Sequence, residues 1–289
     1  MKEAKIILFA GQSNCVGVGH LKYLPKFYDE KTLEEFYNGY EKIRIHYYSH
    51  GNWNKGFTKT DTNGTDRAET FGAEIGIAKR ITELCPNEEY FIVKCAVGGV
   101  NLWRDFLPPS SGAPAYNEEH KRATTDWRTI QPIPFGWCYY ELVRVLAESI
   151  DLLKKEGYSP KICAFCWMQG ESDAVELCQE DGVREYPNRF NNLLADLRAE
   201  FEGYFDDCIV VDAGIAEEWI RHAELNALKK ENAQKHGWVY LDTVGAGLTT
   251  RLEPTENPDT AHYDSQSLVK LGEMFADGFL QKQRLIKKE

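Results

Sequence analysis

Short apolar runs alternate with amphipathic helical patterns along nearly all of this chain. The runs that we expect to be strands are Lys5–Ala10, Lys42–Tyr48, Tyr90–Ala96, Lys161–Met168, Cys208–Ala213 and Trp238–Asp242. The expected helices are Thr70–Leu84, Cys138–Glu156, Tyr186–Phe201, Ile215–His236 and Ser265–Lys282. Apolar strands that alternate with helices are typical of a mostly parallel sheet with helices on both faces. The pattern therefore predicts a three-layer α/β/α sandwich, flavodoxin-like in outline.

Two stretches, 49–69 and 101–135, interrupt this alternation. Both are rich in Gly, Pro, Asn, Thr and aromatic residues and lack sustained periodicity. Loops of this length in a compact domain are usually lids or substrate-binding segments, or else are disordered. Because no repeat or linker divides the chain, we expect one domain over 1–289, with both insertions near the active site.

The formal net charge of −11 at pH 7 restricts the partners. Binding to nucleic acid requires a basic footprint, so no nucleic-acid partner is expected. The same charge favours a neutral small molecule or oligosaccharide over a polyanion. No apolar run approaches the length needed to cross a bilayer, so no membrane segment is expected. The sequence does not indicate the oligomeric state.

The cysteines and the first residues bear on cofactors and location. Cys95, Cys163 and Cys166 lie in apolar contexts, which is typical of buried thiols in a reducing compartment. Cys163 and Cys166 have the spacing of a metal or redox pair, but residues three apart on a strand point to opposite faces. We therefore expect no metal and no cofactor. The short apolar stretch at the start runs directly into candidate site residues, so we expect a cytoplasmic protein, or a secreted one if a leader has been removed.

Polar or glycine-rich segments follow several of the expected strands, at the edge where their carboxyl ends would meet. Open α/β sheets bind ligands at this edge. The segments are Gly11-Gln12-Ser13-Asn14, Gly98-Gly99-Val100-Asn101, Gln169-Gly170-Glu171-Ser172-Asp173 and, before the final helix, Asp259-Thr260-Ala261-His262. We expect all four to share one rim of the sheet.

Acyl transfer gives these segments a chemical role. A serine hydroxyl is a weak nucleophile until an adjacent base takes its proton, and Ser13 and His262 are the candidate nucleophile and base. Asp259, three residues before His262, can reach its other ring nitrogen and stabilise the imidazolium. Each residue singly also has an ordinary explanation as a turn or surface residue. Their shared position on one rim favours the catalytic interpretation.

An oxyanion hole needs preorganised donors. The backbone N–H of Ser13 is one candidate, and the side-chain amide of Gln169 is another. Gly98 or Gly99 can bring a further N–H close because neither has a side chain, and the choice between them stays open. The alternative is that the glycine pair is a tight turn and that Gln169 caps the next helix.

The segments GQSN, GGVNLW, WMQGESD and DTAH, together with FGAEIGIAKR, resemble the motif blocks of SGNH hydrolases. The similarity is to the group containing sialate O-acetylesterases and acetyl xylan esterases, and it extends over nearly the whole chain. It implies that Ser13, Asp259 and His262 form a catalytic triad. It also implies an oxyanion hole made by Ser13, a glycine of the Gly98-Gly99 pair and Gln169.

Other residues of the same blocks are expected to support the site, namely Gln12, Asn14 and Glu171. Gln12 and Gln169 replace the Asp and Asn of the wider lipase-like pattern, which weakens a lipase interpretation. Glu171 could assist His262 as a second carboxylate or hold the neighbouring loop, and we favour the supporting role. Three other histidines could act as the base, but none has a carboxylate three residues before it; they are His20, His46 and His50.

Aromatic and basic residues of the two insertions are the candidates for substrate binding, because sugars stack on exposed rings. The aromatic residues are Trp53, Trp103, Tyr116, Trp127 and Trp137. The equally weighted alternative is that these rings hold long loops to the domain. Asn101, Trp103 and Arg104 follow the glycine pair and are the first candidates for substrate contacts. An anionic sugar could be bound by the arginines, which are Arg67, Arg104 and Arg128.

We expect a serine esterase that removes O-acetyl groups from acetylated xylo-oligosaccharide or from a sialic acid type of substrate, through an acyl-enzyme and without a cofactor. A general short-chain esterase or thioesterase is the alternative within enzymes. A non-catalytic carbohydrate-binding relative that keeps the fold is the alternative outside them.

Overall fold

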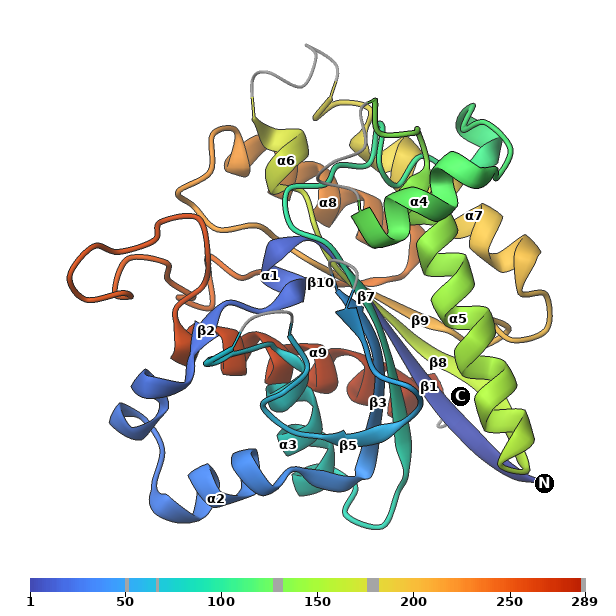
Figure 1. The fold of residues 1–289 in the computed structure, drawn as a ribbon. Helices are drawn as coiled ribbons and strands as arrows, with labels where there is room; N and C mark the ends of the chain where they lie inside the picture. Colours follow the sequence, from blue (N-terminus) through green and yellow to red (C-terminus); the bar gives the residue numbers. More distant parts are fainter. Residues whose placement is uncertain (50–51, 66–67, 127–131, 176–181, 287–289) are drawn as a thin grey trace.

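In the computed structural model, which describes residues 1–49, 52–65, 68–126, 132–175 and 182–286, one large sheet runs through the molecule (Figure 1). Its strands are ordered β10-β9-β8-β1-β7-β3-β4, and β5 also pairs with β3. The parallel strands are β1 (Lys2–Gly11), β3 (Tyr40–Ser49), β7 (Tyr90–Ala96), β8 (Tyr158–Met168), β9 (Ile209–Ala213) and β10 (Val239–Leu241). The antiparallel strands are β4 (Asn52–Trp53) and β5 (Thr58–Thr60).

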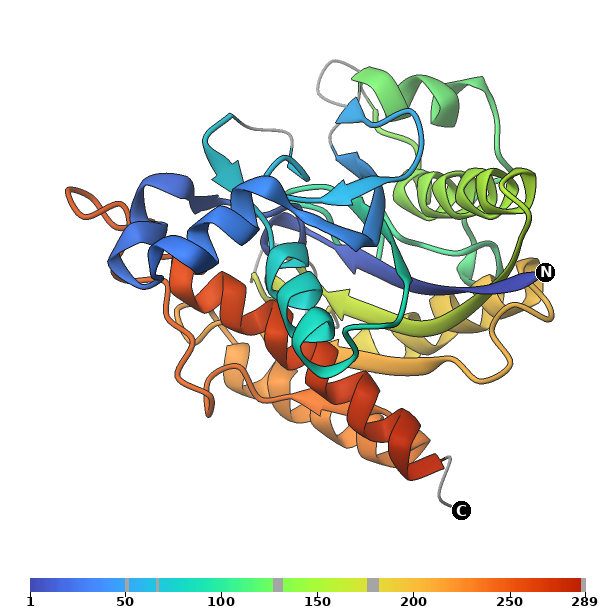
Figure 2. The ribbon, with the colours of Figure 1, turned by 90° about the horizontal axis from the view of Figure 1, so that it is seen from below.

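Helices cover both faces of this sheet (Figures 1 and 2). The helices on one face are α3 (Glu74–Leu84) and α9 (Ser265–Ile286); those on the other are α5 (Trp137–Lys155), α7 (Tyr186–Glu200) and α8 (His222–His236). The remaining helical segments are α1 (Ser13–Val16), η1 (Leu21–Lys26), α2 (Glu30–Asn38), η2 (Pro109–Ser111), α4 (Glu118–Asp126) and α6 (Glu171–Ala174). The predicted three-layer α/β/α sandwich with a mostly parallel sheet is confirmed.

The central strand β1 shows why the sequence folds in this way. Its apolar run is buried on both faces, as expected for a parallel strand inside a three-layer fold. On one face Phe9 contacts Phe275 of α9, with ring centroids 5.5 Å apart. On the other face, Trp167 of the neighbouring β8 packs on Phe190 of α7 at 5.4 Å. Both helical layers are therefore held by aromatic contacts to adjacent central strands.

The strand order differs from that of flavodoxin in one respect. In flavodoxin the first strand lies between the second and the third, whereas here β7 lies between β1 and β3. All the predicted strands are present, and the predicted range Tyr90–Ala96 matches β7 at both ends. The segments that follow β1, β7 and β8 consequently lie side by side.

Two predicted helices begin later than expected. The helix predicted from Ile215 begins at His222, because the Asn226 side chain binds the backbone N–H and C=O of Ile215 and stabilises a loop there. The helix predicted from Thr70 begins at Glu74, because Thr70–Phe71 forms β6 and pairs with β2 (Gly19–His20). In both places a tertiary contact overrides the local helical pattern.

The two insertions contain short elements of their own. The first contains β4 and β5, which extend the sheet beyond β3, and the second contains η2 and α4. Among the helices of the described residues, none combines the length and apolar character that a membrane span requires. Cys163 and Cys166 lie on β8 as free, buried thiols.

Candidate active site

Ser13 is the first residue of α1, directly after the carboxyl end of β1. The turn is tight because the Gln12 carbonyl accepts hydrogen bonds from the N–H groups of Cys15 and Val16, both at 2.8 Å. It also needs Gly11, since a Cβ there would lie 1.9 Å from the backbone oxygen of Met168. The chain thus passes close to β8 and presents a half-exposed Ser13 at the rim of the sheet.

His262 and Asp259 lie in the loop before α9. The His262 Nδ1 is 2.6 Å from the Asp259 Oδ2, and the other oxygen of this carboxylate accepts the Ala261 N–H at 3.0 Å. The second contact fixes the orientation of the carboxylate. With Nδ1 engaged by Asp259, Nε2 is the nitrogen that can receive a proton from a serine.

Asn14 links the serine turn to the histidine loop. Its Oδ1 accepts the backbone N–H of Tyr263 at 3.0 Å, and its Nδ2 lies 3.5 Å from the carbonyl of Ala261. These two residues flank His262, while Asn14 itself follows Ser13. The fully buried Asn14 side chain therefore holds the neighbours of the predicted nucleophile and base together.

Glu171 lies behind this link at the start of α6. Its Oε1 accepts a hydrogen bond from the Asn14 Nδ2 at 2.7 Å, whereas its buried Oε2 has no hydrogen-bond partner among the residues that the structure describes. Burial raises the pKa of Glu171, and the bond from Asn14 and the charges of Lys229 and His262 oppose this rise. The contact with Asn14 fits the supporting role that we predict for this residue.

Gln169 is fully buried, and its amide is occupied by the protein itself. Its Nε2 lies 2.6 Å from the Asp173 Oδ2 and 3.2 Å from both the Gln12 Oε1 and the Val100 carbonyl. Its Oε1 accepts from the Tyr186 hydroxyl at 2.9 Å. An amide has only two N–H groups, and three acceptors already surround them. In this arrangement the amide joins three segments of the chain. Donation from Gln169 to an oxyanion stays a prediction.

Gln12 completes the connection between the β1 and β8 turns. Its Oε1 accepts the Ser172 N–H at 3.1 Å as well as the Gln169 amide. Asp173 accepts the Leu102 N–H at 3.0 Å, and burial raises its pKa to about 6. The three rim segments after β1, β7 and β8 are thus joined by buried side chains.

A buried ion pair supports the Gln169 turn from below. Lys229 of α8 lies 3.0 Å from Asp212 of β9 and donates to the Gln169 carbonyl at 2.6 Å. Burial raises the pKa of Asp212 to about 6, and Lys229 opposes this rise. The sequence does not indicate this role for Lys229, because its partners Asp212 and Gln169 lie elsewhere in the chain.

The glycine pair follows β7 at the rim. Gly98 is half-buried, and Gly99 is exposed with a φ of 74° and open space around its Cα. Non-glycine residues rarely adopt this conformation. The pair lies beside the Ser13 turn because β7 pairs with β1, and both residues stay candidates for the oxyanion donor.

Asn101 and Arg104 are held within their own loop. The Asn101 Oδ1 accepts the Arg104 N–H at 2.9 Å, and the Arg104 guanidinium binds Asp105 at 2.9 Å. Asp105, which our sequence analysis missed, also accepts from the Asn101 N–H and from the Trp137 indole. Trp103 is half-buried and packs on Phe135 at 6.2 Å. These contacts give the Asn101–Arg104 segment a fixed shape.

The competing histidines are placed differently. His46 is buried under α5 with Nδ1 2.8 Å from the Ser149 hydroxyl, and burial lowers its pKa. His20 lies in β2 and contacts Tyr23. His50 lies outside the described residues, as do Arg67, Trp127 and Arg128 of the substrate predictions. Among the remaining aromatic candidates, Trp137 is buried, whereas Trp53 and Tyr116 are exposed.

The layered fold places a polar rim at the carboxyl ends of β1, β7 and β8. Residues 3–281 match the family described as carbohydrate esterase, sialic acid-specific acetylesterase, and the chain belongs to this family. The predicted family resemblance is thereby confirmed, and an esterase acting on carbohydrate acetyl groups is the activity that the family supports. No curated protein matches the sequence.

Solved structures share the fold at low sequence identity. The crystal structure of NanS is similar with a TM-score of 0.62 and 16% identity, over 98% of both chains. A protein from Arabidopsis thaliana has a TM-score of 0.59 and 18% identity, over 96% of this chain and 98% of its own. Est24, a carbohydrate acetylesterase from Sinorhizobium meliloti, has a TM-score of 0.51 and 10% identity, over 98% of this chain and 100% of its own. At these identities the likeness establishes the fold alone.

Proposed function

We propose that this protein is a serine esterase that hydrolyses O-acetyl esters on carbohydrates through an acetyl-enzyme, with Ser13, His262 and Asp259 as its triad. The observation that carries the proposal is the 2.6 Å contact between His262 and Asp259, in a loop that Asn14 ties to the serine turn. Membership of a carbohydrate esterase family supplies the substrate class.

Each step of acyl transfer can be assigned to residues of the proposed site. The Ser13 Oγ attacks the acetyl carbonyl carbon while the His262 Nε2 accepts the hydroxyl proton, and Asp259 stabilises the imidazolium. The carbonyl oxygen becomes an oxyanion that accepts hydrogen bonds from the Ser13 N–H and from an N–H of the glycine pair. Collapse of this intermediate breaks the ester bond, and the proton passes from Nε2 to the departing sugar oxygen.

Deacylation reverses these roles. Water attacks the acetyl group on Ser13 while His262 accepts one of its protons, and the second tetrahedral intermediate releases acetate as the serine oxygen is reprotonated. No step in this scheme requires Gln169 to contact the substrate. Its amide instead hydrogen-bonds Gln12 after β1 and Asp173 after β8, and so joins these two turns.

The substrate that we propose is a neutral acetylated oligosaccharide of the xylan type. The net charge of −11 supports a neutral sugar over an acidic one. The relevant test measures acetate release from acetylated xylo-oligosaccharide, from O-acetylated sialic acid and from aryl esters of increasing acyl length.

Wild-type protein is expected to release acetate from the sugars and to prefer acetyl over long acyl chains. Ser13→Ala is expected to lower turnover by roughly four orders of magnitude without loss of folded protein, as judged by circular dichroism. Equal rates on long acyl chains with no release from any sugar would instead indicate a general esterase. Sugar binding without acetate release would indicate a non-catalytic relative.

A further inference from the structure

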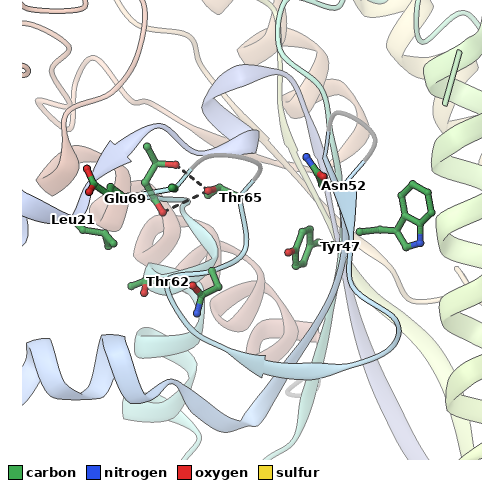
Figure 3. Close-up of a pocket in the computed structure, with 10 residues that line it drawn as sticks. Leu21, Tyr47, Asn52, Thr62, Thr65 and Glu69 are labelled. Atoms are coloured by element: carbon green, nitrogen blue, oxygen red, sulfur yellow. Dashed lines mark hydrogen bonds between the residues drawn. The ribbon is translucent and has the colours of Figure 1, made fainter. Parts of the chain in front are cut away.

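A polar cavity of about 410 Å³ opens beside the carboxyl end of β3 (Figure 3). Here we call it the Tyr47 cavity. The Tyr47 ring extends from β3 into it, facing the segment that contains Thr62 and Thr65, and Leu21 and Glu69 lie on the far side. Other members of its lining carry amide or hydroxyl groups, and they include Asn52, Asn63 and Thr70.

The cavity lies on the same rim as the predicted nucleophile. In the sheet, β7 alone separates β3 from β1, so two strand spacings, or roughly 10 Å, separate their carboxyl ends. A buried lysine connects the two places, since the Lys94 Nζ donates at 2.8 Å both to the Val16 carbonyl of α1 and to the Gly64 carbonyl beside the cavity. The cavity wall and the Ser13 turn are therefore parts of one rigid arrangement.

A second cavity lies between Thr70 and the histidine loop. Its volume is about 560 Å³, and its lining includes His20, Pro258 and Asp259. Thr70 lines both cavities. The two cavities therefore lie on either side of Thr70, and the second reaches Asp259 of the predicted triad.

The lining chemistry matches a neutral sugar. Threonine hydroxyls and asparagine amides can donate and accept hydrogen bonds, as sugar hydroxyls do, and the faces of Tyr47 and Leu21 offer apolar contact. Among the described residues that line the cavity, Glu69 is acidic and none is basic. Its carboxylate can accept hydrogen bonds from neutral sugar hydroxyls, and it would repel a carboxylated sugar.

The backbone at Glu69 is strained in a way that shapes this wall. Glu69 has a φ of 64°, which few residues other than glycine adopt. It is held there because its carbonyl accepts the Leu21 N–H at 3.0 Å and because β6 begins at the next residue. The Thr65 and Thr70 hydroxyls, 2.9 Å apart, close the loop between them. Such strain is found preferentially at ligand-binding sites.

We propose that the Tyr47 cavity binds a neutral sugar unit next to the acetylated one, so that the enzyme prefers acetylated oligosaccharides to acetylated monosaccharides. This inference rests on the proposed function and adds a second subsite to it. Thr70, which lines both cavities, lies between the two units in this arrangement.

The test compares kcat/KM for acetylated xylo-oligosaccharide, acetylated xylose, an acetylated sialoside and an aryl acetate. Tyr47→Phe removes a neutral hydroxyl, and Glu69→Gln replaces a charged acceptor by a neutral one; both changes preserve shape. Each is expected to lower the ratio of oligosaccharide to aryl acetate kcat/KM by about fivefold, which corresponds to one neutral hydrogen bond or to the difference between a charged and a neutral one. Tyr37→Phe, an identical change on the exposed side of α2, is the matched control and should leave this ratio unchanged.

The outcomes separate this inference from the proposed function. Absence of acetate release from every sugar overturns the proposed function. Release from acetylated xylose at the same kcat/KM as from the oligosaccharide overturns the second subsite alone. A proportional loss on aryl acetate in Tyr47→Phe indicates a structural role and also overturns it. A higher kcat/KM for the acetylated sialoside than for the acetylated oligosaccharide in the wild-type protein overturns the assignment of a neutral ligand.

Discussion

The Asn14 side chain connects the turn of the predicted nucleophile with the loop of the predicted base. Its buried side chain binds Glu171 on one side and the backbone on either side of His262 on the other. An alanine there would leave the Tyr263 N–H without its acceptor and the Glu171 carboxylate without its donor. Buried groups that lose their partners cost about 1 to 3 kcal/mol each.

We therefore expect Asn14→Ala to lower the free energy of unfolding by about 3 kcal/mol and kcat by about a hundredfold, because the histidine loop would no longer be fixed relative to Ser13. Urea denaturation and steady-state kinetics measure the two effects. Asn188→Ala, an exposed asparagine on α7, is the control and should change neither. A variant with normal kcat and reduced stability would show that Asn14 does not position the histidine.

At the residue scale, the sequence located the candidate chemistry better than it described the supporting contacts. Ser13 could be placed on the rim because it follows the apolar run of β1, and Asp259 and His262 because they lie in the loop just before the final helix. The hydrogen bonds of Gln169 could not be predicted, since its acceptors belong to three segments far apart in the chain. A motif shows that an amide is needed at a position, but the packing around it decides what the amide binds.

A buried ion pair connects the elements around the nucleophile turn. Lys94 of β7 and Glu74 of α3 are both fully buried and lie 2.8 Å apart. Burial raises the pKa of Glu74, and the nearby Lys94 opposes this rise. A lysine in the middle of an apolar strand was a signal that sequence analysis could have used, because a buried charge requires a partner.

We expect Lys94→Met to lower the free energy of unfolding by about 4 kcal/mol, because Glu74 would be left as an unpaired buried charge. The double variant Lys94→Met, Glu74→Met should be more stable than the single variant, since no charge then stays buried. Urea unfolding of the two proteins gives this difference directly. If the double variant were less stable than the single one, the interaction of Glu74 with Lys94 would not be the main contribution.

The two helices on one face of the sheet cross at glycines. A Cβ at Gly272 of α9 would lie 1.9 Å from the backbone oxygen of Ala73, and a Cβ at Gly76 of α3 would lie 2.0 Å from that of Val269. Backbone atoms cannot move aside as a side chain can, so only glycine permits this spacing between α3 and α9.

Gly272→Ala is accordingly expected to destabilise the protein by about 3 kcal/mol, even though alanine is the better helix former. Gly278→Ala in the same helix is the matched control. A Cβ at Gly278 would meet the Val239 side chain at 3.1 Å, which can shift, so the change there should stay within about 1 kcal/mol. Thermal or urea unfolding of the pair distinguishes close helix crossing from a general intolerance of α9 to substitution.

At the element scale, long periodic segments were predicted well and short ones were not. The strands that form the centre of the sheet read as continuous apolar runs because both of their faces are buried. In contrast, β4 and β5 are two and three residues long and owe their conformation to pairing with β3. No local pattern distinguishes such segments from the loops around them.

The charge of the whole molecule links its stability to pH. The net charge is −11 at pH 7. As pH rises and the carboxyl groups lose their protons, the negative charge of the protein grows, and the repulsion between its like charges increases. Burial also raises the pKa of three carboxyl groups to about 6, those of Asp173, Asp212 and Asp264. The expected cytoplasmic location remains a prediction, and it would expose the protein to a pH at which these carboxyls are largely ionised.

The direction of the effect follows from the difference between folded and unfolded states. Between the ordinary pKa of 3.8 and about 6, the folded protein keeps protons on these groups that the unfolded chain has released. Folding stability therefore falls as pH rises through this window. At lower pH, carboxylates with a lowered pKa act in the opposite sense; the hydrogen bond from Lys2 lowers the pKa of Glu89, for example. We expect maximal stability well on the acid side of neutrality, at about pH 4 to 5, where the groups with a lowered pKa are already ionised and those with a raised pKa still hold their protons.

Asp173 provides the sharpest test, because its buried carboxylate is bound by the uncharged Leu102 N–H and Gln169 amide. Asp173→Asn removes the titrating group. The difference in unfolding free energy between wild type and this variant should shift by about 2 kcal/mol against wild type from about pH 4.5 to about pH 7.5, since one pKa unit corresponds to about 1.4 kcal/mol and part of the titration lies below pH 4.5. Urea unfolding at intermediate pH values measures the slope, and Asp151→Asn on the exposed side of α5 should leave it unchanged. If the difference for Asp173→Asn did not vary with pH, Asp173 would already be ionised in the folded protein at the acid end, and the stability maximum would have to come from the remaining carboxyls and from self-repulsion.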